Sequence, residues 1–309
     1  MDKLRALQTF MAIVDQGSLT RAAEHLHSSL PATVRSLAAL EQHLGVRLLQ
    51  RTTRRLALTE DGRLYLDRAR RIVADLEEAD RIVGAQQQAP AGLVGVTAPV
   101  LFGQMHVAPT VRRFLQQHPQ VRVNLVLLDR VVNLVEEGLD VGVRIGALAD
   151  SSLVAQRVGL MRRVVVASPA FLRRHGVPRH PKALTQAPCL NFQGVDGPNW
   201  AFRDAGRAFH VAVSGPLECN LSAPMLEACA EGLGFVRCMH YQVQPWLQDK
   251  RLRIVLADFE PEPWPVQITY PSARQLSTRT RAFVDALKAD LHQRLVSAPR
   301  QRSAPASVA

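Results

Sequence analysis

The feature that most constrains this chain is a series of helical patterns separated by small residues near its N-terminus. Apolar residues recur at three- and four-residue steps in the first pattern, which Gly17 closes: Leu4, Leu7, Phe10, Met11 and Val14. Ser18 can cap a short second helix, in which Ala22 and Ala23 permit the close approach of a neighbouring helix. This spacing predicts two helices that cross closely, as a helix-turn-helix requires.

A third helix is predicted between Ser29, which can act as its N-cap, and Gly45, which can stop it. Pro31 is tolerated because it falls in the first turn. The buried stripe of this helix consists of Leu37, Leu40 and Leu44, and its opposite face carries Ser29, Pro31, Ala32, Arg35 and Ser36. Small residues with one arginine can enter a DNA major groove without clashing, so this face is a candidate recognition surface.

Residues 46–59 contain two short apolar pieces around a turn of sequence QRTTRR, which predicts a β-hairpin wing. The turn carries Arg51, Thr53, Arg54 and Arg55. Arginines at a hairpin tip can lie along a phosphate backbone or enter a narrow minor groove. The alternative is a solvated turn beside a purely structural helix pair. The preceding helix pair favours DNA contact.

The stretch from Ser18 to Gly62 resembles the DNA-binding head of LysR-type transcriptional regulators. The matching residues are Ser29, Pro31, Ala32, Arg35, Leu40, Glu41, Leu44, Gly45, Val46, Arg51, Arg54, Leu58, Thr59 and Gly62. One departure is that Thr33 and Val34 stand where many members have Val and Ser. Val34 can touch a thymine methyl but cannot donate a hydrogen bond to a phosphate. The resemblance implies a winged helix-turn-helix over residues 1–58 that binds double-stranded DNA.

Thr59 can cap a long helix over residues 59–88, whose apolar stripe consists of Leu66, Ala69, Val73, Leu76, Ala79 and Val83. The stripe could pack on its own domain, but we expect it to pair with a second copy. The family resemblance implies dimerisation through this element. A homodimer or homotetramer would then read half-sites related by symmetry.

The net charge of +11 favours a polyanionic partner, yet it does not locate the DNA site. Residues 1–58 hold eight Lys and Arg against four Asp and Glu, a net of +4, so most of the excess lies elsewhere. No apolar run is long enough to span a bilayer, and the N-terminus lacks the pattern of a secretory signal. We therefore expect a cytoplasmic protein without a membrane partner.

After a glutamine-rich hinge at residues 86–92, apolar strand patterns alternate with helical ones, which predicts an α/β fold with a largely parallel sheet. The segment VVNLVEEG is among the predicted helices. The resemblance implies an effector-binding domain over residues 89–296 that is similar to periplasmic binding proteins. Its first lobe would comprise residues 89–162 and 264–296, and its second lobe residues 163–263. The Ala-, Pro- and Ser-rich tail, residues 297–309, is predicted to be disordered.

Ligands of such folds bind at the carboxyl ends of strands and near helix N-termini, where backbone N–H groups favour an anion. The residues at these points are Pro99, Val100, Asp129, Arg130, Arg144, Ile145, Asn191, Phe192, Asn220 and Ser222. Arg144 is the preferred carboxylate ligand because its guanidinium offers a bidentate fork. Its alternative is a structural ion pair, and the alternative for the others is packing or turn chemistry.

Rival functions have weaker support. The histidines are dispersed and no catalytic or nucleotide-binding motif occurs, so we expect neither an enzyme nor a cofactor. Four cysteines without CxxC spacing argue against a zinc site or a disulfide framework; they are Cys189, Cys219, Cys229 and Cys238. A cysteine-based redox sensor of the same architecture stays open, whereas a body this large is excessive for an architectural protein. We expect a regulator that binds a small, anionic metabolite. Binding would change how the protein bends DNA or how it contacts RNA polymerase.

Overall fold

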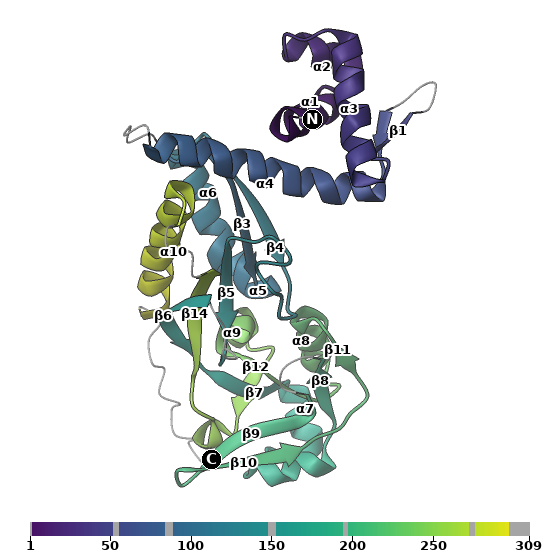
Figure 1. The fold of residues 1–309 in the computed structure, drawn as a ribbon. Coiled ribbons are helices and arrows are strands. Elements are labelled where there is room, and N and C mark those ends of the chain that lie inside the picture. Colours follow the sequence, from purple (N-terminus) through teal and green to yellow (C-terminus); the bar gives the residue numbers. More distant parts are fainter. Residues whose placement is uncertain are drawn as a thin grey trace. The chain divides into compact units, whose positions relative to one another are not determined.

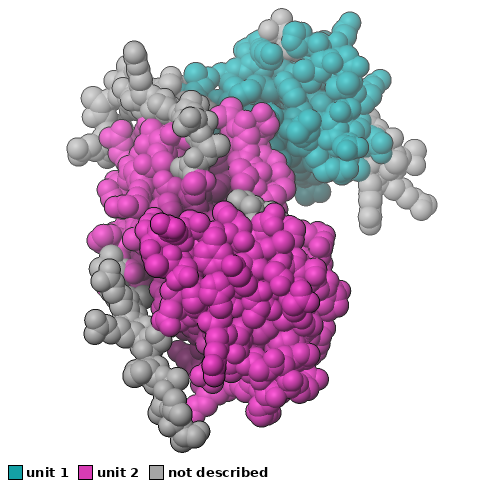
Figure 2. All heavy atoms as spheres, turned by 90° about the horizontal axis from the view of Figure 1, so that it is seen from below, with its two compact units in different colours: residues 1–93 teal, residues 94–309 magenta. Residues whose placement is uncertain are grey.

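The chain divides into two compact units, residues 1–93 and residues 94–309 (Figure 2). The computed structural model describes residues 2–51, 56–83, 89–147, 153–193, 197–271 and 276–296. The first unit consists of helices and one small hairpin, and the second combines two five-stranded sheets with helices. This confirms the predicted fold class.

Helices α1, α2 and α3 of the first unit begin and end at the residues that the sequence indicates, whereas α4 is described only to Val83 (Figure 1). The elements are α1 (Lys3–Gln16), α2 (Leu19–His25), α3 (Leu30–Leu44), β1 (Leu49–Arg51), β2 (Leu56–Leu58) and α4 (Glu60–Val83). The side chain of Ser18 accepts the N–H of Arg21, and that of Ser29 accepts the N–H of Ala32. Gly17 closes α1 in the left-handed conformation, at a φ of 61°, so the local capping signals alone set these boundaries.

Gly62 brings the start of α4 directly against the backbone that leads into β1. A Cβ at this position would lie 2.0 Å from the carbonyl oxygen of Leu48, which no side chain could tolerate. Thr59 caps the same turn, because its Oγ1 accepts the N–H of Gly62 at 2.8 Å and donates to the carbonyl of Arg47 at 2.7 Å. The hairpin and α4 are therefore joined through backbone contacts.

The first half of the apolar stripe of α4 packs within its own unit, whereas we expected the stripe to pair with a second copy. Leu66, Ala69 and Val73 are buried within the first unit, the last two in a cluster with Leu7 of α1. These three residues therefore face α1 and not a second copy, and pairing through the rest of α4 stays a prediction. Leu76 is exposed, and nothing is described of the side chains of Ala79 and Val83 or of residues 84–88.

The second unit contains two mixed sheets with strand orders β4-β3-β5-β14-β6 and β11-β8-β12-β7-β13. The first sheet and its helices are β3 (Gly92–Ala98), α5 (Val100–Phe102), a π-helical turn (Gly103–Val107), α6 (Ala108–Gln117), β4 (Val121–Leu127), β5 (Val141–Ile145), β6 (Leu153–Met161), β14 (Trp264–Pro271) and α10 (Thr278–Val296). The second comprises β7 (Arg163–Ala167), α7 (Pro169–His175), β8 (Cys189–Phe192), β11 (Glu218–Cys219), α8 (Ser222–Ala230), β12 (Phe235–Met239), α9 (His240–Gln248) and β13 (Arg253–Val255). Strands β9 (Asn199–Asp204) and β10 (Arg207–Ala212) form a separate antiparallel hairpin, and 3-10 turns occupy Pro181–Gln186 and Ala257–Phe259.

Two expectations for this unit need correction. The sheets are mixed rather than largely parallel, because β14 returns antiparallel to β5 and β6, and β7 runs antiparallel to β12 and β13. The segment VVNLVEEG forms turns instead of a helix. The side chain of Asn133 accepts the N–H of Val135 at 3.0 Å, and Gly138 has a φ of 60°, so local turn bonds displace helical ones.

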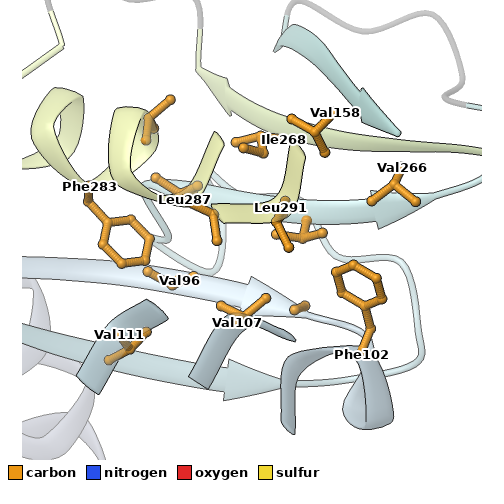
Figure 3. Packing of buried hydrophobic residues seen from close by; sticks show 14 of the residues in the cluster. Val96, Phe102, Val107, Val111, Val158, Val266, Ile268, Phe283, Leu287 and Leu291 are labelled. Atoms are coloured by element: carbon orange, nitrogen blue, oxygen red, sulfur yellow. The ribbon is translucent and has the colours of Figure 1, made fainter. Parts of the chain in front are cut away.

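Side chains from distant parts of the chain form the core of the first sheet (Figure 3). Phe283, Leu287 and Leu291 of α10 point toward Val96 of β3 and Ile268 of β14. Strand β14 therefore lies in the same sheet as β3, and α10 packs against that sheet, although both elements come near the end of the chain. The chain crosses between the two sheets twice, once from β6 to β7 and once before β14.

Candidate functional site

The outward face of α3 is the first candidate site. Ser29, Pro31 and Arg35 are exposed, and Ala32, Val34 and Ser36 are partly exposed. No ion pair within the described residues holds Arg35, so its guanidinium can extend from the helix. Leu30, which the sequence analysis did not include, is 42% exposed on the first turn of the same helix.

Thr33 and Val34 differ in position as well as in chemistry. Thr33 is 2% exposed, and its hydroxyl has no hydrogen-bond partner among the described residues. Val34 is partly exposed beside Arg35. The departure from the family pattern thus places a hydroxyl in the core of the helix-turn-helix and an apolar side chain on its outer face.

Glu41 of α3 fixes the approach of the hairpin to the recognition helix. Its buried Oε1 accepts the N–H groups of Leu48 at 2.8 Å and Leu49 at 3.2 Å, and its Oε2 accepts Arg47 Nη1 at 3.1 Å. Hydrogen bonds to a charged acceptor are stronger than neutral ones. The start of β1 is therefore held on α3 by a carboxylate with three partners.

The tip of the hairpin lies outside the described residues, and with it the predicted contacts Thr53, Arg54 and Arg55. Strands β1 and β2 pair antiparallel, with Arg51 opposite Leu56, so residues 52–55 connect them. The backbone of Arg51 belongs to β1, but its side chain is not described. The hairpin confirms the predicted β-wing, whereas the DNA contacts of its arginines stay a prediction.

A cavity of about 130 Å³ in the second unit is the second candidate site. It lies where β3, β4, β5, β8 and β12 end and where β7, β14, α8 and α9 begin. Its lining is Pro99, Asp129, Ile145, Arg163, Phe192, Ser222, Met225, Arg237, Cys238, Met239, Tyr241, Gln242 and Trp264. The space could hold about ten water-sized groups, which suits a small molecule.

The structure brings half of the predicted ligand residues together at this cavity. Those that line it are Pro99, Asp129, Ile145, Phe192 and Ser222, and those that do not are Val100, Arg130, Arg144, Asn191 and Asn220. Val100 lies directly behind the lining, because its N–H donates to Asp129 Oδ1 at 2.9 Å. Asn191 is buried and donates its N–H to Leu217, whereas Asn220 is exposed.

Neither of the two predicted arginines lines the cavity. Arg144, the preferred carboxylate ligand, donates to the backbone carbonyls of Val143 at 3.2 Å and Val132 at 3.5 Å. Arg130 pairs with Glu137 on the surface at 2.8 Å. The structure does not place Arg144 at the cavity, because its guanidinium donates to backbone carbonyls of its own strand and of a neighbouring loop.

Two other arginines line the cavity. Arg163 is 3% exposed, with its guanidinium carbon 4.1 Å from the centre of the Trp264 ring, and Arg237 is 8% exposed. Val165 pairs with Arg237 and Met239 with Arg163, so the two arginines are diagonal neighbours on one face of the β7–β12 pair. The signal in the sequence was an arginine inside each of the apolar runs RVVVA and FVRCM.

Asp129 is the acidic residue of the lining. Burial raises its pKa, and the hydrogen bond from Val100 opposes the rise. Gln242, which also lines the cavity, links α9 to α8, because its Nε2 donates to Ser222 Oγ at 3.1 Å and its Oε1 accepts the N–H of Met239 at 2.9 Å. The cavity thus combines fixed polar groups with an apolar remainder.

Three of the four cysteines are buried. Burial raises the pKa of Cys189 and of Cys229 to about 12, and it raises the pKa of Cys238 as well. At neutral pH these three side chains are thiols rather than thiolates. Cys219 is partly exposed.

The part of the chain that the structure describes holds no group of three His, Cys, Asp or Glu side chains arranged to bind a metal ion. None of its helices is both long and apolar enough to cross a bilayer.

Two family models cover most of the chain. Residues 4–63 match the bacterial regulatory helix-turn-helix protein of the lysR family, and residues 87–292 match the LysR substrate binding domain. The first match contains α1, α2, α3 and the hairpin, and the second contains the cavity.

Similar proteins match this chain over nearly its whole length. A transcriptional repressor of the helix-turn-helix type from Pseudomonas aeruginosa is 32% identical over 92% of this chain and 91% of its own length. The regulator CrgA of Neisseria meningitidis serogroup B is 33% identical over 94% of this chain and 97% of its own. Solved structures of Neisseria meningitidis CrgA and of AphB, a Vibrio cholerae virulence activator, superpose with TM-scores of 0.59 and 0.60. Their identities are 31% and 26%, and each match covers 93% of this chain and 98% of the other.

Proposed function

Because this chain belongs to the LysR family of bacterial transcriptional regulators, we propose that α3 and the β1–β2 wing bind promoter DNA and that a small anionic molecule in the cavity alters this binding. The observation that carries the DNA role is the outer face of α3, where Arg35 is exposed among small side chains. The hydrogen bonds that Glu41 accepts from Leu48 and Leu49 hold the hairpin on α3, so the two proposed DNA-contacting surfaces belong to one unit.

Arg35 is proposed to read bases, and Arg54 and Arg55 are proposed to contact phosphates, with Arg51 and Thr53 beside them. A base contact favours some sequences, whereas a phosphate contact strengthens binding to all sequences and makes it dependent on salt. Arg144 has no proposed ligand role, because its guanidinium is turned to backbone carbonyls.

Selection of DNA fragments by the purified protein tests this proposal. The sequences retained are expected to share a site with two-fold symmetry. Arg35→Ala should flatten the preference between bases, with a loss of about 1–3 kcal/mol at the best site, while Arg55→Ala should weaken all sequences and lower the salt dependence. Failure to enrich any symmetric site, or an equal loss on every sequence for Arg35→Ala, would contradict these roles.

We propose that the active form is a dimer, or a tetramer built from dimers, that pairs through α4. Leu64, Ile72 and Leu76 are 66%, 53% and 42% exposed, although they are large apolar residues. Steps of eight and four residues place them within about a third of the helix circumference. This face is adjacent to the stripe that α1 covers, and a second α4 would bury it.

A redox sensor has less support than a metabolite sensor. Three of the four cysteines are buried thiols with raised pKa values, whereas oxidation requires an accessible thiolate. A thiol titration before and after peroxide treatment should show no oxidised pair. The named relatives are transcriptional regulators, and no catalytic role is proposed.

A further inference from the structure

The outer face of α3 carries an apolar stripe beside Arg35. Its members, Leu30, Val34 and Ala38, recur at steps of four residues, which places them one turn apart along one flank of the helix. Leu30 is 42% exposed, Ala38 is exposed and Val34 is partly exposed. In the part of the chain that the structure describes, none of the three packs into the apolar clusters of the first unit. The stripe is therefore available to a partner.

Folding of the first unit does not depend on this stripe. Helix α3 is anchored on its other side, where Leu37 and Leu40 are buried in the core of the unit. A side chain as exposed as that of Leu30 keeps much of its apolar surface in water, so it contributes little to stability until a partner covers it. That partner must also accommodate the positive charge of Arg35, which favours the major groove of DNA.

The stripe can read a base only through apolar contact. Leucine, valine and alanine side chains carry no hydrogen-bonding group, and Pro31 lacks a backbone N–H. The hydroxyl of Ser29, next to the stripe, accepts the N–H of Ala32 at 3.3 Å. Of the four bases, thymine alone presents a methyl group in the major groove. The polar edge of another base would lose its water against the stripe without gaining a hydrogen bond, so the stripe selects thymine.

We propose that Leu30 and Val34 read the methyl groups of thymines in the major groove, while the neighbouring Arg35 supplies the polar contacts. This inference rests on the proposed DNA-binding role of α3, and it adds which chemical group of the DNA is read. Burial of one methyl group strengthens binding about fourfold. Because each protomer of a dimer contributes one α3, sensitive thymines are expected at positions related by two-fold symmetry.

Replacement of thymine by uracil tests this proposal. The two bases differ only by the methyl group, so base pairing and the minor-groove edge stay the same. The full chain first selects its preferred sites from a pool of random DNA duplexes. Each thymine of a selected site is then replaced in turn by deoxyuridine, and the dissociation constant is measured by fluorescence anisotropy at fixed salt. At least one replacement in each half-site is expected to weaken binding about fourfold.

Variants assign this effect to the stripe. Leu30→Asn keeps the shape of the side chain but makes it polar, and Val34→Ser removes both methyl groups. The double variant should bind the thymine and the uracil duplexes equally. Leu160→Asn is the matched control, because Leu160 is 53% exposed on β6 of the second unit, and it should keep the full difference. Circular dichroism checks that each variant is folded.

The outcomes that overturn the proposal are distinguishable. A defined site in which no thymine is sensitive to uracil would exclude methyl reading and leave the DNA-binding role intact. An unchanged difference in the double variant would assign the methyl contact to other residues. If Leu30→Asn dissociated the oligomer in sedimentation velocity, the stripe would be a contact between subunits. Failure to enrich any site would count against the DNA-binding role itself, and the inference would fall with it.

Discussion

Arg162 and Glu260 face each other across the two connections between the sheets, with Arg162 Nε 2.8 Å from Glu260 Oε2 and Arg162 Nη2 2.7 Å from Oε1. Arg162 stands between β6 and β7, and Glu260 precedes β14. The hydrogen bonds that Arg162 donates to Glu260 raise the pKa of Arg162. The carbonyl of Arg162 also accepts the N–H of His240 at 2.9 Å, which links this ion pair to the start of α9.

Glu260→Gln should lower the free energy of unfolding of the second unit by about 1 kcal/mol, since the pair is partly exposed to solvent. Urea denaturation of the full chain measures this loss. Hydrogen exchange at the amide of His240 should rise at the same time. The double variant Arg162→Glu with Glu260→Arg restores opposite charges, and its failure to recover any stability would contradict a role for the pair.

Thr33→Val should stabilise the first unit by about 1 kcal/mol, because it removes a buried hydroxyl without a partner among the described residues. Thr9 is the matched control. It is equally buried, but its Oγ1 donates to the carbonyl of Arg5 at 2.8 Å, so Thr9→Val should destabilise by a similar amount. Thermal unfolding of both variants gives the comparison. Equal effects of the two changes would show that the Thr33 hydroxyl is bonded in solution.

Ile72→Glu should dissociate the proposed dimer, because it places a charge in the middle of the exposed apolar face of α4. Sedimentation velocity measures the oligomeric state. Val46→Glu is the control, since Val46 is 40% exposed in the same unit but lies outside α4. If both variants kept the mass of the parent, association through α4 would be excluded.

The second unit should lose stability as the pH falls from about 7 toward 5. Burial, and secondarily the charge of Arg294, lower the pKa of His106, which packs between the rings of Phe102 and Tyr241. Below the unfolded value of 6.5, the unfolded chain binds a proton that the folded chain does not, so acid favours unfolding. His106→Leu should show a smaller fall in Tm between pH 7.5 and 5.5. Part of the fall should remain, because burial also lowers the pKa of His240. An identical pH profile would remove His106 as its source.

Helix boundaries were accessible to sequence analysis because their causes are local. The caps Ser18 and Ser29 and the stop at Gly45 act within one turn of the chain. The partner of the α4 stripe was not accessible in this way. Leu7 and Val73 are far apart in sequence, and the spacing of the stripe is the same whether α1 or a second copy covers it.

The exact residues that line the cavity were likewise not predictable from the sequence pattern. The ends of the strands were predicted, yet of Pro99 and Val100, Asp129 and Arg130, Arg144 and Ile145, and Asn191 and Phe192, one residue of each adjacent pair lines the cavity. In β5 and β8, successive side chains point to opposite faces, so only one of Arg144 and Ile145, and only one of Asn191 and Phe192, faces the cavity. Arg163 and Arg237 meet through the register of β7 with β12, which no local pattern encodes.

The carboxylate of Glu41, with its three partners at the start of β1, makes the position of the hairpin independent of the residues on the outer face of α3. It fixes the hairpin on α3 from the inner side, whereas Val34 and Arg35 lie on the outer side. If these surfaces bind DNA as proposed, substitutions on the outer side change the bases preferred without altering the distance between the two proposed contacts. Divergence within such a family can proceed on one helix face while the scaffold behind it stays constant.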